Sequence, residues 1–90
     1  MTSNAGTPPR YNLALVTQVI LEEAVDIDPE HLTVGELSLR IVTDPNDDKE
    51  VEIATQAIRD LRQSGLFRYG DDDQVVEPTP AALLAYELLA

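Results

Sequence analysis

The sequence contains no cysteine and only one histidine, His31. The lack of thiols excludes a disulfide framework, thiolate catalysis and cysteine-ligated zinc. His31 would have to serve any Ser-His-Asp arrangement, but it lies next to Pro29 and Glu30 in an expected turn. The four glycines are scattered and form no phosphate-binding loop. We therefore expect a non-enzymatic protein that uses no cofactor, metal or small-molecule substrate.

Basic residues are also scarce, with 6 Lys and Arg against 17 Asp and Glu, for a formal net charge of −11. Four of the six basic residues fall within residues 49–70. This segment is therefore the first candidate for a functional surface. A strongly negative chain attracts basic partners and disfavours nucleic acid. The charge thus indicates a protein partner, or a homodimer, over duplex DNA.

No long hydrophobic run occurs. The longest strongly apolar stretch, residues 80–90, falls short of the ~20 residues that span a bilayer. Residues 1–10 have no apolar core and are predicted to form a flexible tail. We expect a cytoplasmic protein without a membrane partner, with residues 11–90 as its single domain.

Apolar residues recur with the period of a helix in several segments. Leu13, Val16, Ile20 and Ala24 are three or four positions apart, and Asn12 before them is a suitable N-cap. Such spacing places the apolar residues on one face. We predict helices over residues 12–24, 33–43, 47–64 and 80–89.

The start of the second helix carries the clearest local signal. Thr33 and Glu36 have the spacing of a capping box, and Leu32 and Leu37 occupy the two positions of a hydrophobic staple. Residues 25–31, which include a proline, are predicted to form the turn before it.

Beyond residue 64 the apolar pattern changes from helical to alternating. Residues 66–69 and 74–77 are predicted strands, and the Gly-Asp-Asp-Asp segment between them suits a hairpin turn. Gly65 suits the left-handed C-terminal cap of the preceding helix. The prediction is a mostly α fold with a small β-hairpin (α+β), in the order helix-helix-helix-strand-strand-helix.

Two segments carry a family resemblance. Residues 57–69 (AIRDLRQSGLFRY) resemble the end of a winged helix-turn-helix recognition helix running into the first wing strand. Residues 75–82 (VVEPTPAA) are similar to the return strand and the start of the last helix. The resemblance covers roughly residues 11–90 and extends to small winged-helix proteins of actinobacteria. It implies a module that binds either DNA or a protein.

If the partner is DNA, the resemblance implies that the third helix enters the major groove. Glutamine and arginine side chains can read adenine and guanine there. The candidate recognition face is Thr55, Gln56, Arg59, Arg62 and Gln63. In the wing, Arg68 would join Arg62 in meeting phosphates, whereas Asp71, Asp72 and Asp73 would lie close to phosphates and repel them. The five residues of the candidate recognition face also suit the solvated face of an ordinary amphipathic helix, with Asp60 neutralising a neighbouring arginine.

The start of the third helix further weakens the hypothesis that the protein binds DNA. The N-terminal part of a recognition helix approaches the bases. Here that end is rich in carboxylates, which the helix dipole favours for purely structural reasons. They are Asp44, Asp47, Asp48, Glu50 and Glu52, offset by Lys49 alone.

The last helix has a single charge, Glu87, and apolar residues around nearly all of its circumference. A helix of this kind is normally buried on more than one side. We expect it to dock against a second copy or another protein through Leu83, Leu84, Leu88 and Leu89. The alternative is a well-buried terminal helix with a few exposed leucines.

The function predicted from the sequence is a non-enzymatic regulatory or adaptor module that acts through protein–protein contacts and self-association. The alternative is a duplex-DNA-binding transcriptional regulator that uses the third helix and the wing, as a dimer. An acidic DNA mimic that inhibits a nucleic-acid-binding protein is the less favoured third hypothesis.

Overall fold

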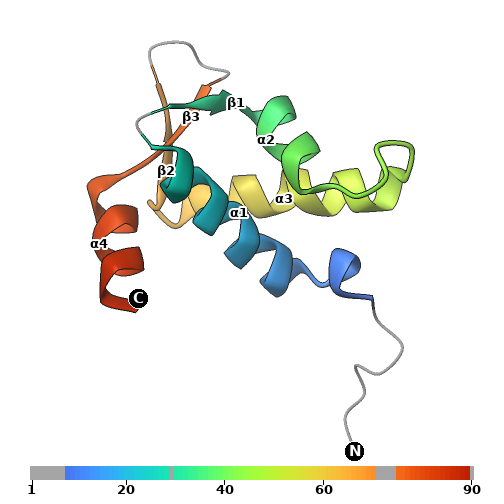
Figure 1. Cartoon of the computed structure of the whole chain (residues 1–90), viewed down its shortest axis with the longest axis horizontal. Helices are drawn as coiled ribbons and strands as arrows, with labels where there is room; N and C mark the ends of the chain where they lie inside the picture. Colours follow the sequence, from blue (N-terminus) through green and yellow to red (C-terminus); the bar gives the residue numbers. More distant parts are fainter. Residues whose placement is uncertain (1–7, 29, 71–74, 90) are drawn as a thin grey trace, which may run out of the picture.

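The computed structural model describes residues 8–28, 30–70 and 75–89, with the side chains up to residue 88. Within these residues a group of helices packs against a small sheet (Figure 1). The elements are η2 (Pro9–Tyr11), α1 (Leu13–Ile27), β1 (Leu32–Thr33), α2 (Val34–Ile41), α3 (Asp48–Gln63), β2 (Phe67–Tyr69), β3 (Val75–Pro78) and α4 (Pro80–Leu89). The fold is mostly helical with a small antiparallel sheet, which confirms the predicted α+β class.

The sheet has three strands in the described part of the chain, in the order β1-β3-β2, where the sequence predicts two. Leu32 pairs with Val76, and Arg68 pairs with Glu77. The missed strand β1 has two residues, too few to show an alternating pattern, and its partner lies more than forty residues further along the chain. The prediction of a two-stranded hairpin alone is therefore wrong.

Several predicted boundaries shift. Helix α1 continues to Ile27, so the predicted turn over residues 25–31 begins too early. Helix α2 ends at Ile41 because Val42 is already extended, with φ −69° and ψ 131°. Leu66 precedes β2 instead of starting it, because its amide donates to the Leu61 carbonyl at 3.0 Å and closes the end of α3.

Polar caps fix the helix starts where the sequence places them. The Asn12 side chain accepts from the Leu15 amide, and Thr33 with Glu36 forms the complete capping box. The hydrogen bond from the Thr33 backbone lowers the pKa of Glu36. The Thr79 hydroxyl accepts from the Ala82 amide at 3.3 Å, which caps α4.

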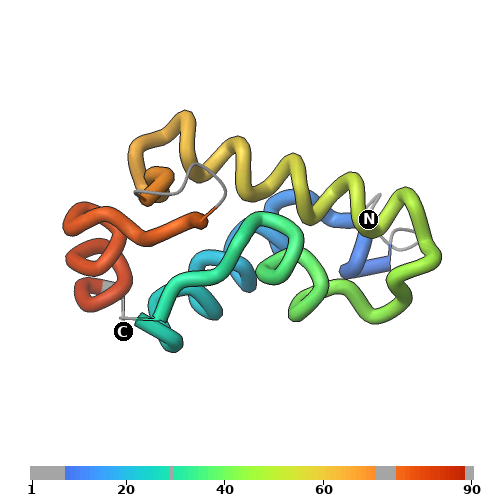
Figure 2. Tube along the Cα trace, turned by 90° about the horizontal axis from the view of Figure 1, so that it is seen from above, coloured from blue at the N-terminus to red at the C-terminus, as the bar shows by residue number. Residues whose placement is uncertain are grey.

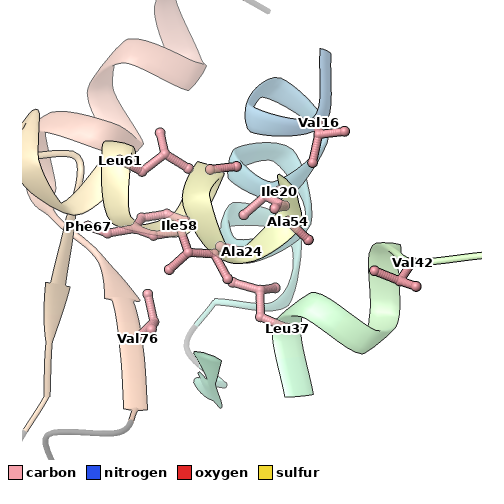
Figure 3. Packing of buried hydrophobic residues seen from close by; sticks show 11 residues of the cluster. Val16, Ile20, Ala24, Leu37, Val42, Ala54, Ile58, Leu61, Phe67 and Val76 are labelled. Atoms are coloured by element: carbon pink, nitrogen blue, oxygen red, sulfur yellow. The ribbon is translucent and has the colours of Figure 1, made fainter. Parts of the chain in front are cut away.

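The core lies where α1, α2 and α3 meet the sheet (Figure 3). Its largest fully buried side chains are Phe67, Ile20, Leu37 and Ile58. The predicted stripe of α1 is buried except for Leu13, which is 39% exposed because it lies in the first turn, at the edge of the packed region. Burial of this one cluster supplies the main stabilising term of a domain of this size.

Figures 1 and 2 place α4 at the end of the molecule remote from η2. Helix α4 packs against α1 and β3. Its N-terminus is tied to the end of α3, because the Thr79 hydroxyl also donates to the Gly65 carbonyl at 2.7 Å. One side of α4 is therefore held firmly against the domain.

Gly65 is expected to be the glycine least tolerant of a side chain. Its φ is +85°, and the 3.1 Å bond from its amide to the Arg62 carbonyl completes a Schellman motif with Leu66. A Cβ there meets nothing within 4 Å, so the cost of Gly65→Ala is purely conformational, about 1–2 kcal/mol of unfolding free energy. Gly35→Ala, inside α2 and against only Thr33 Oγ1 at 4.0 Å, is the matched control and should stabilise by about 0.5–1 kcal/mol. Urea denaturation of both variants measures the difference; equal effects would contradict the strain at Gly65.

Candidate functional site

The predicted recognition residues share one side of α3. Ala54, Ala57, Ile58 and Leu61 face the core, and the predicted residues lie on the opposite side. Two of them already have partners within the helix. The Thr55 hydroxyl donates to the Val51 carbonyl at 2.9 Å, and the Gln56 amide donates to Asp60 Oδ1 at 2.8 Å. We call the set Thr55, Gln56, Arg59, Arg62 and Gln63 the α3 face.

The arginines beside this face also contact their own chain. The Arg62 guanidinium lies over the Tyr69 ring, 4.5 Å from its centroid. Arg68 Nε is 2.6 Å from Glu77 Oε1 across the β2–β3 pair. Arg59 is exposed, and among the described residues no carboxylate lies within 4.0 Å of it. The expectation that Asp60 neutralises an arginine is wrong, because among the described residues no arginine lies within 4.0 Å of its carboxylate, which accepts from Gln56.

The Arg68–Glu77 pair belongs to a longer chain of polar contacts. Glu77 Oε2 is also 3.4 Å from His31 Nδ1, and His31 Nε2 is 3.4 Å from Asp28 Oδ1. This network joins β2 and β3 to the connection between α1 and β1, so it steadies the hairpin. The predicted wing-tip residues Asp71, Asp72 and Asp73 lie outside the described residues.

At the start of α3, the carboxylate of Glu50 is a structural group. The residue is only 3% exposed, and its oxygens accept from the Thr43 amide at 2.8 Å and the Asp44 amide at 3.1 Å. The Thr43 hydroxyl donates to the same carboxylate at 2.9 Å. The bond from the Thr43 backbone is the main reason that the pKa of Glu50 is lowered. Glu50 therefore holds the α2–α3 connection in place.

A hydrogen bond between Tyr11 and Asp47 is a second structural contact at the start of α3. Asp47 caps α3 through the Lys49 and Glu50 amides, and the Tyr11 hydroxyl donates to its other oxygen at 2.5 Å. The bond from Tyr11 lowers the pKa of Asp47. Arg10 and Lys49 both lie over the Tyr11 ring, with their charged groups 4.7 and 4.6 Å from its centroid. Lys49, the one cation at the start of α3, thus packs on its own chain.

The leucines predicted for docking differ in solvent exposure. Leu84 is 57% exposed and Leu88 is 77% exposed, whereas Leu83 is partly buried and Ala82 is fully buried. Leu89 ends α4, and its side chain lies outside the described part of the structure. Among the docking leucines whose side chains the structure describes, Leu84 and Leu88 are therefore the most exposed.

Sequence reasoning missed an apolar groove beside α1. It has a volume of about 210 Å³ and lies between the first half of α1 and the end of α2, with Leu15, Val19, Ile41 and Val42 in its lining. Binding pockets for small molecules are typically about 300–1,000 Å³, so this groove is small. Leu15 and Val19 stand four positions apart, and this spacing was the signal available in the sequence.

No group of three or more His, Cys, Asp or Glu side chains in the described part of the chain is arranged to hold a metal ion. None of the helices in residues 8–28, 30–70 and 75–89 combines the length and the apolar character needed to cross a membrane.

No protein-family model, curated protein or solved structure matches the chain. The structure defines a small acidic α+β domain with an α3 face at one surface and exposed leucines on α4. Its function is therefore inferred from its own contacts, burial and charge.

Proposed function

We propose that this protein is a winged-helix adaptor, without catalytic activity, that regulates another protein through direct contact. The element order supports the winged-helix assignment, with α3 in the place of the recognition helix and β2 and β3 in the place of the wing. The same fold serves both DNA and protein partners, so the surface has to decide between them.

The observation that carries the proposal is that the cations beside the α3 face are engaged within the chain. Arg62 stacks on Tyr69, Arg68 pairs with Glu77, and Lys49 packs on Tyr11. DNA affinity comes largely from neutralised phosphates, and a phosphate would have to compete with the carboxylate of Glu77 for Arg68. Arg59 is left as the single α3-face cation without an ion-pair or ring partner among the described residues.

The charge of the whole chain acts in the same direction. A formal net charge of −11 repels a polyanion and steers basic proteins toward the surface. Leu84 and Leu88 add exposed apolar area of the kind that protein interfaces bury. Charge and apolar exposure together favour a protein partner.

Binding to duplex DNA at low salt tests this function. Fluorescence anisotropy of a labelled mixed-sequence duplex should show no saturable binding by the wild-type chain or by the Arg59→Ala/Arg62→Ala variant. A protein that reads DNA bases through this face would instead lose about 1–3 kcal/mol of binding free energy for each base-contacting arginine. The salt dependence of its DNA affinity would also be weaker in that variant. Arg40→Ala is the control, because Arg40 pairs with Glu23 at 2.6 Å, away from the α3 face.

One outcome would overturn the proposal. Saturable binding that the α3-face variant weakens and the Arg40→Ala control retains would make the chain a DNA-binding regulator. Circular dichroism of each variant confirms that the fold is intact, because Arg62→Ala also removes the stacking on Tyr69.

A further inference from the structure

A row of polar side chains crosses one face of the sheet, from β2 to the residue that precedes β1. Arg68 on β2 lies opposite Glu77 on the central strand β3. One step beyond the paired residues of β1, the antiparallel register places His31 opposite the same Glu77 on its other side. The contacts agree with this register, because Glu77 Oε1 is 2.6 Å from Arg68 Nε and Glu77 Oε2 is 3.4 Å from His31 Nδ1. Glu77 therefore links the two outer strands of the sheet.

The imidazole ring of His31 has a carboxylate beside each of its nitrogens. Its Nε2 lies 3.4 Å from Oδ1 of Asp28, the residue that ends α1. The side chains of Glu77, His31 and Asp28 are 19%, 30% and 33% exposed, so water screens their contacts only in part. Glu30, the chain neighbour of His31, is exposed, and among the described residues no other carboxylate lies within 4.0 Å of the ring.

Only the charged form of the imidazole satisfies both carboxylates. The neutral ring carries a single N–H, so its other nitrogen would turn a lone pair toward a carboxylate oxygen. The imidazolium carries an N–H at each nitrogen and can donate to Glu77 and Asp28 at the same time. Its positive charge also lies between two negative ones, which completes an alternation of sign that begins at Arg68. The arrangement therefore fits protonated His31.

We propose that Asp28, His31 and Glu77 form a pH-sensitive clamp, which fastens the β2–β3 hairpin to the end of α1 when His31 is protonated and loosens as the ring loses its proton. Histidine is the side-chain type that changes charge between about pH 5 and 8. His31 is the only histidine in a chain that has no cysteine, so the clamp holds the one side chain suited to this range. The inference goes beyond the adaptor function and does not depend on the partner.

The clamp lies next to the surface to which function is assigned. Strand β2 carries Tyr69, whose ring lies under the Arg62 guanidinium of the α3 face. Loosening the hairpin therefore loosens the support of that arginine.

Thermal unfolding of the full chain at about pH 5.5 and about pH 8, near the two ends of the histidine range, tests the clamp. His31→Gln keeps a polar side chain that takes up no proton. At the lower pH its melting temperature should lie about 2–5 °C below that of the wild type, because two partly exposed ionic contacts are lost. Stabilisation that depends on a bound proton is lost as the pH rises. At the higher pH the difference should therefore shrink to about 1 °C or less.

Two further variants separate the clamp from ordinary ion pairs. Glu23→Gln is the matched control, because it breaks the 2.6 Å pair with Arg40, whose two groups both keep their charge across this range. Its loss of melting temperature should be the same at both pH values. Asp28→Asn removes the charge that faces Nε2, and its pH dependence should lie between those of the wild type and His31→Gln.

The contradicting results are distinct. An equal loss of melting temperature for His31→Gln at both pH values would make His31 an ordinary polar contact and overturn the clamp. A larger loss at the higher pH would overturn it as well, because the neutral ring would then be the favoured form. The Cε1–H signal of the only histidine follows ring protonation in the wild type by proton NMR. A signal that does not move between the two conditions would also contradict the proposal.

Discussion

Replacing Phe67 with alanine is expected to destabilise the domain by about 3–5 kcal/mol. Phe67 begins β2, is only 2% exposed, and is the largest of the fully buried side chains. It packs in the cluster that joins the sheet to α1 and α3, so its loss leaves a cavity at the point where the hairpin meets the helices (Figure 3). Domains of this kind have a total stability of about 5–15 kcal/mol, so the loss should be at least about a fifth of the total.

Urea denaturation followed by circular dichroism measures the loss. Leu39→Ala is the control, because Leu39 is large and apolar but 57% exposed, and its removal should change the stability by about 0.5 kcal/mol or less. Similar midpoints for the two variants would contradict the position of the core.

The second large effect concerns Glu50. Glu50→Gln keeps the size of the side chain but replaces one accepting oxygen by a donor, while the Thr43 and Asp44 amides still need acceptors. A buried backbone N–H left without a partner is costly, and we expect the melting temperature to fall by roughly 5–10 °C. Thr43→Val removes only the hydroxyl donor and should lower it less. A melting temperature equal to that of the wild type would contradict the structural role of Glu50.

The same carboxylate makes stability depend on pH in a defined direction. The hydrogen bond from the Thr43 amide is the main cause that lowers the pKa of Glu50 from its ordinary value of 4.5. Its contribution is complete above that unfolded-state value and is lost as the pH falls through the lower folded-state pKa. Acidification also relieves the repulsion within a chain of net charge −11, so the informative quantity is the difference between wild type and Glu50→Gln. That difference should shrink as the pH falls below 4.5; a constant difference would contradict the lowered pKa.

The sequence predicted most of the fold because its signals are local. The capping box at Thr33 and Glu36, the left-handed Gly65 and the Thr79 cap each act within a few residues, and all three occur in the structure. The strand β1 was missed because its two residues owe their extended pairing to Val75 and Val76, far along the chain. Periodicity reports what a segment buries but not which distant segment it pairs with.

The candidate surfaces were predicted less completely, for a related reason. Residue spacing groups the α3 face on the side of its helix away from the core, whereas of the four leucines predicted for docking Leu84 and Leu88 are exposed and Leu83 is partly buried. It could not show that Arg62 lies over Tyr69, that Glu50 is buried, or that Tyr11 binds Asp47. Those contacts join elements that the sequence separates, and they change cations and carboxylates from apparent surface groups into structural ones.

The most direct test of the adaptor function is an NMR titration of the full labelled chain with mixed-sequence duplex DNA at low salt, where even non-specific phosphate contacts are favoured. We predict that the amide signals of Thr55, Gln56, Arg59, Arg62 and Arg68 stay unchanged. Saturable shifts clustered on these residues would contradict the adaptor function and establish the α3 face as a DNA-binding surface.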